Sequence, residues 1–347
     1  MPAAEKRRCL PGSIAVINPR TELVRLINGF QASQAISVAV ALGLADQLRD
    51  GPAGAAEIAG AIGAHPDALH RLMRVLAGIG VIQNAGADRF ALTAMGELLR
   101  RDASGTCAPM AELFGRPNVW QAWGDLLHTV QTGATAFDHV HGCSVWDYRS
   151  RNPEEAGIFD RAMASGTDRF AQAVLDVYDF GRFEHVIDVG GGDGVFLAKI
   201  LERHPAVRGT LFDQPNVIAR SGQSAQFPNR FQVVGGDFFD SVPGDGDAYL
   251  LKWILHDWSD TASVDILRSC RRAMKRSGRL LVAEYVLDLG NLPDGAFMDL
   301  TMMVMNGGRE RTREEFSSIF AAAGFRLTSV TATTTPLCLL EGTIDRA

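Results

Sequence analysis

The sequence predicts an α/β protein with a doubly wound, mostly parallel sheet, preceded by a helical, winged-helix-like N-terminal domain. After residue 183, short apolar runs alternate with helical stretches, which is typical of a parallel sheet covered by helices. Before residue 105, apolar and small residues recur at helical spacing. Because a domain averages roughly 150 residues, we divide the 347-residue chain into an N-terminal domain (1–105), a helical linker (106–180) and a sheet domain (181–347).

The composition excludes several classes of protein. A formal charge of −6 opposes any partner bound through phosphates or an anionic membrane surface. Five scattered cysteines without a C-x-x-C pair argue against a zinc knot or a disulfide framework, and favour a reducing compartment. No stretch reaches the roughly 20 apolar residues of a membrane span, and the start MPAAEKRRCLPGSIAVI lacks the apolar core of a signal peptide. We therefore expect a cytoplasmic protein that binds neither nucleic acid nor membrane.

The first predicted element is an apolar helix within residues 20–48. Its large side chains recur at near-helical spacing, at Leu26, Phe30, Ile36, Val40 and Leu44. A helix that is apolar nearly all round must be buried, and a second subunit can bury it. The sequence thus predicts a homodimer, the alternative being an ordinary core helix within one subunit.

Residues 55–93 predict a helix, a turn, a second helix and a small hairpin, the order of a winged-helix module. The second helix carries apolar residues at helical spacing: Leu69, Leu72, Met73, Leu76 and Ile79. Its basic groups are His70, Arg71 and Arg74, beside Asp67, which is too little charge to neutralise many phosphates. A DNA-binding regulator is therefore disfavoured.

Residues 103–180 are predicted to be helical and rich in aromatic side chains, and the sheet follows them. Six strands are expected, at residues 184–190, 209–213, 230–237, 247–254, 278–286 and 325–332. Because a glycine-rich turn follows the first of these strands, a ligand is expected at the carboxyl edge of the sheet.

That glycine-rich turn, DVGGGDGVF over residues 188–196, indicates the ligand. The G-x-G-x-x-G pattern of dinucleotide sites fails in both registers, because Val195 and Leu197 stand where the third glycine is needed. The run instead matches the glycine turn of S-adenosylmethionine-dependent methyltransferases, through Asp188, Gly190, Gly192 and Gly194. A purely structural turn is the alternative.

Two acidic residues at strand ends support a nucleoside ligand. Asp213 follows Asp188 by 25 residues, close to the separation at which an acid reaches ribose hydroxyls in such folds. Asp237 is placed to accept the adenine amino hydrogen while Phe238 covers the ring. The alternatives are a helix cap for Asp213 and a solvated loop acid for Asp237.

Several motifs together resemble one family. DVGGGDG, GDFF, LKWILHDWSD (251–260), VAEYV, MDLTMM and GGRERT follow one another as in small-molecule O-methyltransferases of the plant caffeic acid type and their actinomycete antibiotic-tailoring relatives. The resemblance covers nearly the whole chain. It implies a class I methyltransferase fold, an N-terminal dimerisation domain, S-adenosylmethionine as cofactor with S-adenosylhomocysteine as product, and no metal.

The resemblance also implies the catalytic groups. His256, in LKWILHDWSD, is expected to act as a general base on the acceptor hydroxyl, because histidine suits proton removal near neutral pH. Glu284 and Glu310 are expected to flank His256 and favour its imidazolium, with Asp257 supporting the site by a hydrogen bond. A positioning role alone is the alternative for His256.

Further residues match binding positions of that family. The cofactor contacts implied are Lys252 and Trp253 beside the adenosine, Met163, and Thr167 near the methionine carboxylate. The acceptor contacts implied are Met302 and Asn306, and we add Trp146 from the aromatic helical segment. Alternatives remain: Lys252 as a strand-end surface charge, and the methionine cluster around Met302 as ordinary core.

The predicted function is methyl transfer from S-adenosylmethionine to a hydroxyl of an aromatic or polycyclic small molecule, in secondary metabolism, by in-line displacement. Two other enzymatic activities stay open. One is N-methylation, and the other is a non-methylating reaction, such as hydroxylation, decarboxylation or ring closure, with the cofactor bound.

Overall fold

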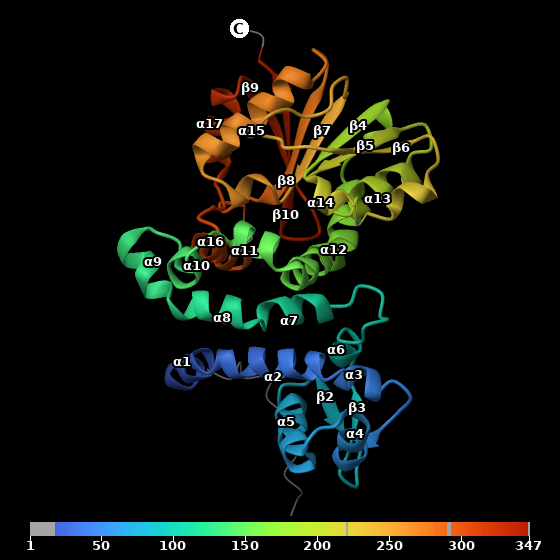
Figure 1. Ribbon diagram of the computed structural model, residues 1–347, viewed down its shortest axis with the longest axis vertical. Coiled ribbons are helices and arrows are strands. Elements are labelled where there is room, and N and C mark those ends of the chain that lie inside the picture. Colours follow the sequence, from blue (N-terminus) through green and yellow to red (C-terminus); the bar gives the residue numbers. More distant parts are fainter. Residues whose placement is uncertain (1–17, 220, 290–292, 346–347) are drawn as a thin grey trace, which may run out of the picture. The chain divides into compact units, whose positions relative to one another are not determined.

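A computed structural model describes residues 18–219, 221–289 and 293–345. The chain divides between Gly96 and Glu97 into two compact units, and each is described separately (Figure 1). In the described part of the chain, every helix is too short or too polar to cross a membrane.

The first unit is mainly helical. Its helices are α1 (Pro19–Ile27), α2 (Gly29–Ala41), α3 (Leu44–Gln47), α4 (Ala55–Ile62), α5 (Pro66–Gly78) and α6 (Ala94–Glu97), which crosses the boundary. The prediction of one apolar helix over residues 20–48 is wrong, because this stretch forms three helices. Asn28 and Gly29 are weak helix formers at the first break. Gly43 adopts a left-handed φ of 63° at the second, which favours glycine.

The winged-helix arrangement is present as predicted. Helices α4 and α5 are followed by an antiparallel hairpin of β2 (Ile82–Asn84) and β3 (Arg89–Leu92), with β1 (Ala53–Gly54) on the other side of β3. The core of this module is formed by Leu69, Met73, Leu76 and Phe90, all at most 3% exposed. One face of α5 is therefore buried, and through it the helices pack against the hairpin.

Helix α1 buries none of its own residues. Large apolar side chains along α1 and the start of α2 are exposed instead, with fractions of 59% for Leu23, 61% for Leu26, 63% for Ile27 and 54% for Phe30. We call these four residues the α1 apolar face. Several exposed large apolar side chains close together in sequence are typical of an interaction site.

The second unit contains a seven-stranded sheet in the order β6-β5-β4-β7-β8-β10-β9. Its strands are β4 (His185–Val189), β5 (Arg208–Asp213), β6 (Phe231–Gly235), β7 (Ala248–Lys252), β8 (Arg279–Tyr285), β9 (Phe325–Ala332) and β10 (Leu337–Ile344). The pairs among β4 to β8 are parallel, whereas β10 runs antiparallel to both neighbours. The predicted doubly wound, mostly parallel sheet is thus confirmed.

Strand β10 is absent from the six predicted strands. It lies between β8 and β9, and its residues Leu337, Leu339 and Leu340 are at most 1% exposed. A strand buried on both faces gives a continuous apolar run rather than an alternating pattern, and the run PLCLL is too short to be recognised by periodicity alone.

Helices cover both faces of the sheet (Figure 1). Helices α12 (Pro153–Leu175), α13 (Val195–Arg203) and α14 (Pro215–Ile218) lie on one side, and α15 (Asp260–Ala273) and α17 (Arg313–Ala322) on the other. Among the described residues, this unit also has short 3-10 helices at η1 (Phe180–Arg182), η2 (Gln223–Gln226) and η3 (Leu255–Asp257).

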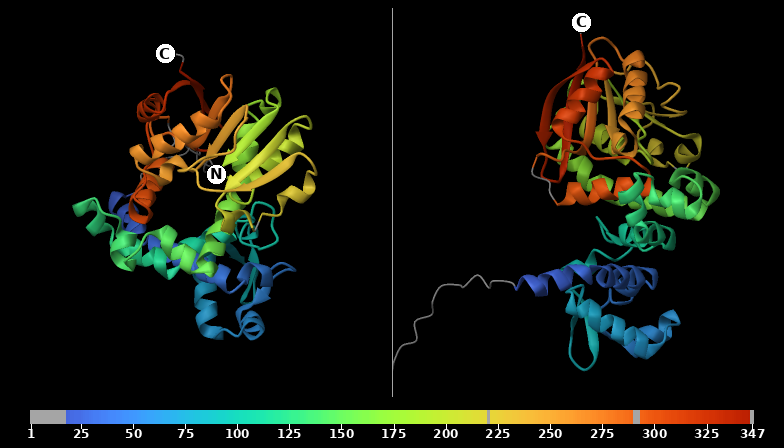
Figure 2. Two further views of the ribbon diagram at one scale, coloured as in Figure 1. Left: turned by 45° about the horizontal axis from the view of Figure 1, so that its top comes forward. Right: turned by 90° about the vertical axis from the view of Figure 1, so that its left-hand side faces the viewer.

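The remaining helices gather near one end of the sheet (Figure 2). They are α7 (Ala108–Phe114), α8 (Pro117–Gly124), α9 (Leu126–Thr132), α10 (Ala136–His141), α11 (Val145–Arg151) and α16 (Asp294–Met305). Helix α16 packs on α8, α9 and α10, around a core that includes Phe137 and Val304. The strand order reverses beside β4, where ligands of doubly wound sheets bind.

Candidate active site

The glycine turn after β4 has the backbone conformation that only glycine adopts easily. Gly190, Gly192 and Gly194 have φ values of 71°, 63° and 84°. A Cβ added to Gly190 would lie 2.4 Å from Cδ1 of Ile254, whereas one added to Gly192 would meet nothing within 4 Å. The turn therefore packs tightly beneath Gly190 and opens at Gly192. Asp213, which ends β5, accepts a hydrogen bond from the Gly192 N–H at 2.8 Å.

Asp188 lies directly before this turn and is 1% exposed. Its Oδ2 has no hydrogen-bond partner among the described residues. Burial raises the pKa of Asp188 to about 7, and the nearby charge of Lys252 opposes that rise. A buried acceptor without a donor fits a polar or cationic ligand at this turn.

Lys252 ends β7, and its Nζ lies 3.2 Å from the hydroxyl of Thr167 and 4.3 Å from the ring centroid of Trp253. Burial lowers its pKa to about 8, against the field of Asp188. The Thr167 hydroxyl in turn donates to the Met163 carbonyl at 2.6 Å. The structure thus places Lys252 and the adjacent Trp253, at the end of β7, beside Thr167 of α12, whose hydroxyl bonds to the backbone of Met163.

Trp253 has a φ of 54°, which is rare for a bulky residue and marks a strained turn at the end of β7. Its N–H bonds to the Ala283 carbonyl at 3.1 Å, and its ring lies nearly parallel to that of His256, with centroids 6.4 Å apart. The turn at Trp253 redirects the chain into η3, which carries His256.

His256 is 6% exposed and lies among three carboxylates. Its Nδ1 is 2.7 Å from Oε1 of Glu310 and 3.6 Å from Oε2 of Glu284, and its Nε2 is 3.6 Å from Oδ1 of Asp257. All four predicted catalytic residues therefore meet at one point. The contact to Glu310 orients the ring and leaves Nε2 as the nitrogen away from that bond.

The carboxylates control the pKa of His256. Burial alone would lower it and is the largest single influence, but the fields of Glu284, Glu310 and Asp257 together outweigh burial and raise the pKa to about 10. Burial raises the pKa of Glu284 to about 7, although His256 opposes this. The three carboxylates therefore favour the imidazolium that forms when His256 accepts a proton.

The loop that carries His256 is held by two buried charged side chains. Oε1 of Glu284 accepts the N–H groups of Ile254 and Leu255 at 3.0 and 2.9 Å. Arg311, which is 0% exposed, donates to the carbonyls of Leu255 and Trp258, each at 2.8 Å. Sequence reasoning did not single out Arg311, although it directly follows Glu310 in GGRERT.

Asn306 caps α16 and connects it to the His256 loop. Its Nδ2 donates to Oδ1 of Asp257 at 2.6 Å and lies 3.6 Å from the Met302 sulfur. Beyond it, a Cβ on Gly308 would lie 1.9 Å from the His256 carbonyl, so only glycine allows the two segments to approach this closely. The predicted acceptor residue Asn306 thus contacts Asp257, the neighbour of His256 in the chain, and Met302 contacts Asn306.

Aromatic rings line the region next to the base. Trp146 stacks against Trp258 with centroids 6.5 Å apart, and Phe238 meets Trp258 edge-on at 6.0 Å. Asp237 is exposed and accepts the Phe239 N–H at 2.8 Å. Among the described residues, the Asp237 side chain makes no hydrogen bond or ion pair with the other predicted site residues.

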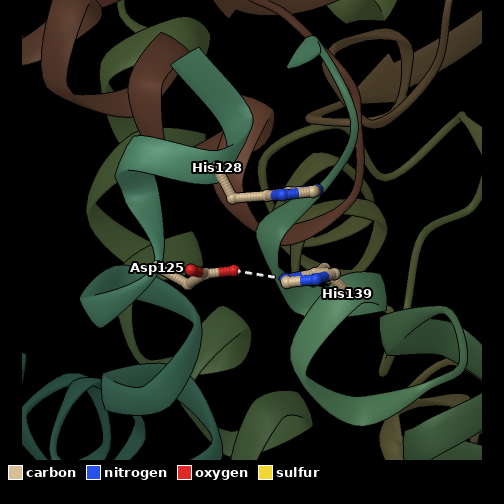
Figure 3. Close-up of side chains that lie close together, drawn as sticks. All are labelled: Asp125, His128 and His139. Atoms are coloured by element: carbon tan, nitrogen blue, oxygen red, sulfur yellow. Dashed lines mark hydrogen bonds and ion pairs between the residues drawn. The ribbon is translucent and has the colours of Figure 1, made fainter. Parts of the chain in front are cut away.

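A group of side chains that could act as metal ligands, separate from the His256 cluster, lies at Asp125, the residue before α9, and on α9 and α10 (Figure 3). His139 Nδ1 is 2.7 Å from Oδ2 of Asp125, and the rings of His128 and His139 are parallel within 5° at 3.8 Å. An ion bound by an imidazole lies in the plane of that ring. Two parallel planes 3.8 Å apart share no such position, so we describe this group as a hydrogen-bonded histidine–aspartate pair beside a stacked ring.

Family models match both units. One described as the O-methyltransferase domain matches residues 123–326, and one described as the O-methyltransferase dimerisation domain matches residues 24–102. The chain belongs to the O-methyltransferase family. The resemblance inferred from its motifs is therefore confirmed.

Individual relatives agree with the family models. Phenazine O-methyltransferase PhzM of Lysobacter antibioticus is 42% identical over 323 residues, covering 92% of this chain and 94% of the relative. The mitomycin biosynthesis 6-O-methyltransferase of Streptomyces lavendulae is 36% identical and covers 91% and 92%. The crystal structure of LaPhzM matches with a TM-score of 0.90 at 41% identity, over 94% of this chain and 100% of the other. The predicted methyltransferase fold is thus confirmed, and the protein is an O-methyltransferase.

Proposed function

We propose that this O-methyltransferase transfers the methyl group of S-adenosylmethionine to a hydroxyl of an aromatic or polycyclic small molecule, with His256 as the general base. The observation that carries the proposal is the placement of a buried imidazole among Glu284, Glu310 and Asp257, one turn beyond the strand that neighbours the glycine turn.

The residues present fit the cofactor. The open backbone at Gly192, the unpartnered Oδ2 of Asp188, and the carboxylate of Asp213 supply a cradle for a nucleoside with a charged amino acid end. We assign Lys252, Trp253, Met163, Thr167, Asp237 and Phe238 to the same ligand. Bound there, S-adenosylmethionine supplies an electrophilic methyl group, whose bond to sulfur breaks as the acceptor oxygen bonds to carbon.

The acid–base work is done by the protein. Nε2 of His256 accepts the hydroxyl proton of the acceptor, while Glu310 holds Nδ1 at 2.7 Å and stabilises the imidazolium. A phenol has a pKa of about 10. The neighbouring carboxylates raise the pKa of His256 above its ordinary value of 6.5, toward that of a phenol, which makes its neutral form a stronger base toward the acceptor hydroxyl. The reaction involves no metal in this scheme, and a chelator is expected to leave its rate unchanged.

The acceptor class follows from the aromatic surroundings of the base. Trp258, the second residue after His256, stacks against Trp146, and Met302 contacts Asn306, which binds Asp257, so flat and adaptable apolar side chains surround the His256 loop. Two relatives support this class by their names: one is a 3-amino-4-hydroxybenzoate 4-O-methyltransferase, and another a 2,7-dihydroxy-5-methyl-1-naphthoate 7-O-methyltransferase.

We also propose that the protein is a homodimer that works in the cytoplasm. The match to a dimerisation domain over residues 24–102 and the α1 apolar face support the dimer. The division into a dimerisation domain (1–105), a linker that contributes to the acceptor pocket (106–180) and a cofactor-binding domain (181–347) stays a prediction.

The test is a methylation assay with methyl-labelled S-adenosylmethionine and matched naphthols, phenols and aryl amines, read by mass spectrometry. Label on a hydroxyl oxygen supports the proposal. Label on nitrogen alone would favour N-methylation, which the name of one 38% identical relative describes. Calorimetry completes the test: binding of S-adenosylmethionine at micromolar concentration, without binding of NAD, is expected, and tighter binding of NAD would overturn the cofactor assignment.

A further inference from the structure

Arg149, near the end of α11, is a stacked cation without an anionic partner. Its Cζ lies 3.6 Å from the ring centroid of Phe159 and 5.1 Å from that of Trp146. Within the described part of the chain, its guanidinium makes no hydrogen bond and no ion pair. Stacking fixes the plane of a guanidinium but leaves its N–H groups, which point outward in that plane, available for a ligand.

The position of Arg149 connects it to the reaction site. Among the carboxylates near Arg149, Asp257 raises the Arg149 pKa most, and the Arg149 charge in turn lowers the pKa of Asp257. They form no ion pair, so their charged atoms are more than 4.0 Å apart. Asp257 instead accepts from Asn306 at 2.6 Å. The Asp257 carboxylate is thus engaged elsewhere, and Trp146, which contacts both Arg149 and Trp258, links the Arg149 cation to the segment that carries His256.

The surroundings of Arg149 also match a flat ligand. Trp146, over which Arg149 lies, stacks against Trp258, the second residue after His256. Burial lowers the pKa of Arg149 to about 10, which still leaves it charged at neutral pH. A desolvated guanidinium gains most from a planar anion that accepts two parallel hydrogen bonds, as a carboxylate does.

We propose that Arg149 binds a carboxylate of the acceptor, so that the preferred substrates are aromatic hydroxy acids whose carboxylate stands apart from the hydroxyl that His256 deprotonates. This inference rests on the proposed function and adds the class of acceptor. A purely structural Arg149, held by ring stacking and by the negative end of α11, would give no preference for an acid over its amide.

The experiment measures binding of monohydroxy-1- and 2-naphthoates, each paired with its carboxamide, to the full-length protein saturated with S-adenosylhomocysteine. Calorimetry gives both affinities. For at least one pair, the acid is expected to bind roughly tenfold or more tightly than the amide, the scale of hydrogen bonds to a charged group. In Arg149→Gln this ratio is expected to fall to near one, with Arg149→Lys between the two.

The control is Arg151→Gln, which removes the same charge from an exposed position on the same helix and is expected to keep the wild-type ratio. Thermal unfolding and S-adenosylhomocysteine affinity show that each variant is folded. Absence of any acid preference in the wild type, or a ratio that survives in Arg149→Gln, would overturn the inference. If naphthols are still methylated in that case, the proposed function stands, whereas failure to bind S-adenosylhomocysteine would count against the proposed function itself.

Discussion

Replacing Glu310 by glutamine changes the charge at His256 while keeping a side chain of the same size. Glu310 contributes the shortest contact to the imidazole, 2.7 Å, and one of the three negative fields that raise its pKa to about 10. A charge at this distance shifts a pKa by about 1–3 units. Glu310→Gln is therefore expected to lower the pKa of His256 by about that amount.

The assay is the pH dependence of kcat/KM for a phenolic acceptor. Only the neutral imidazole accepts a proton, so the wild-type rate is expected to rise with pH through an inflection above the ordinary histidine value of 6.5. In Glu310→Gln the inflection moves to lower pH. The maximal rate also falls, because the imidazolium formed in the reaction loses its partner.

Two comparisons make this result decisive. Glu314→Gln removes the same charge from an exposed position on α17 and should leave the inflection in place. His256→Ala should lower the rate by about 10²- to 10⁴-fold and remove the inflection, with little change in cofactor affinity. An inflection that stays unmoved, or rises, in Glu310→Gln would refute the assignment of the titrating group to His256.

Three further predictions concern packing, stability and assembly. Gly308→Ala forces the backbone at His256 to shift and should lower kcat by about 100-fold, whereas Gly157→Ala in α12 should leave kcat unchanged in the same assay. His256 binds its proton more tightly in the folded than in the unfolded protein, so its contribution to stability is complete below pH 6.5 and is lost as the pH rises through about 10. The thermal unfolding temperature should therefore fall more over this pH range in the wild type than in His256→Asn. Ile27→Asp places a charge on the α1 apolar face and should give a monomer in sedimentation, and an unchanged dimer would contradict that interface.

The sheet and the location of the site could be predicted because their signals are local in sequence. Asp188 and Asp213 lie at the carboxyl ends of two apolar runs, which places both acids at the same edge of neighbouring parallel strands. In the structure the glycine turn that follows Asp188 reaches Asp213, which accepts the Gly192 N–H. Likewise, His256 follows β7 by four residues, so any parallel sheet brings it to the same edge.

Other features depend on contacts between distant segments. Strand β10 is defined by its insertion between β8 and β9, which no local pattern records. Arg149 is significant because Phe159 stacks on it and Asp257 is near, and both relations arise only when α11 packs against α12 and the His256 loop. In the sequence, Arg149 is one of several arginines in a helical segment, and nothing there distinguishes it from Arg151.

The geometry of the base is fixed by groups that do not react. Trp253 is held in a left-handed conformation that a bulky residue rarely adopts, and such strain persists only where the surroundings enforce it. Here Glu284 binds the N–H groups after this turn, and Arg311 binds the carbonyls of Leu255 and Trp258 on either side of His256. Because these bonds are made by buried charged groups, releasing the loop would leave those charges unpaired. His256 is therefore oriented before any acceptor arrives, and the energy of acceptor binding is not needed to assemble the base.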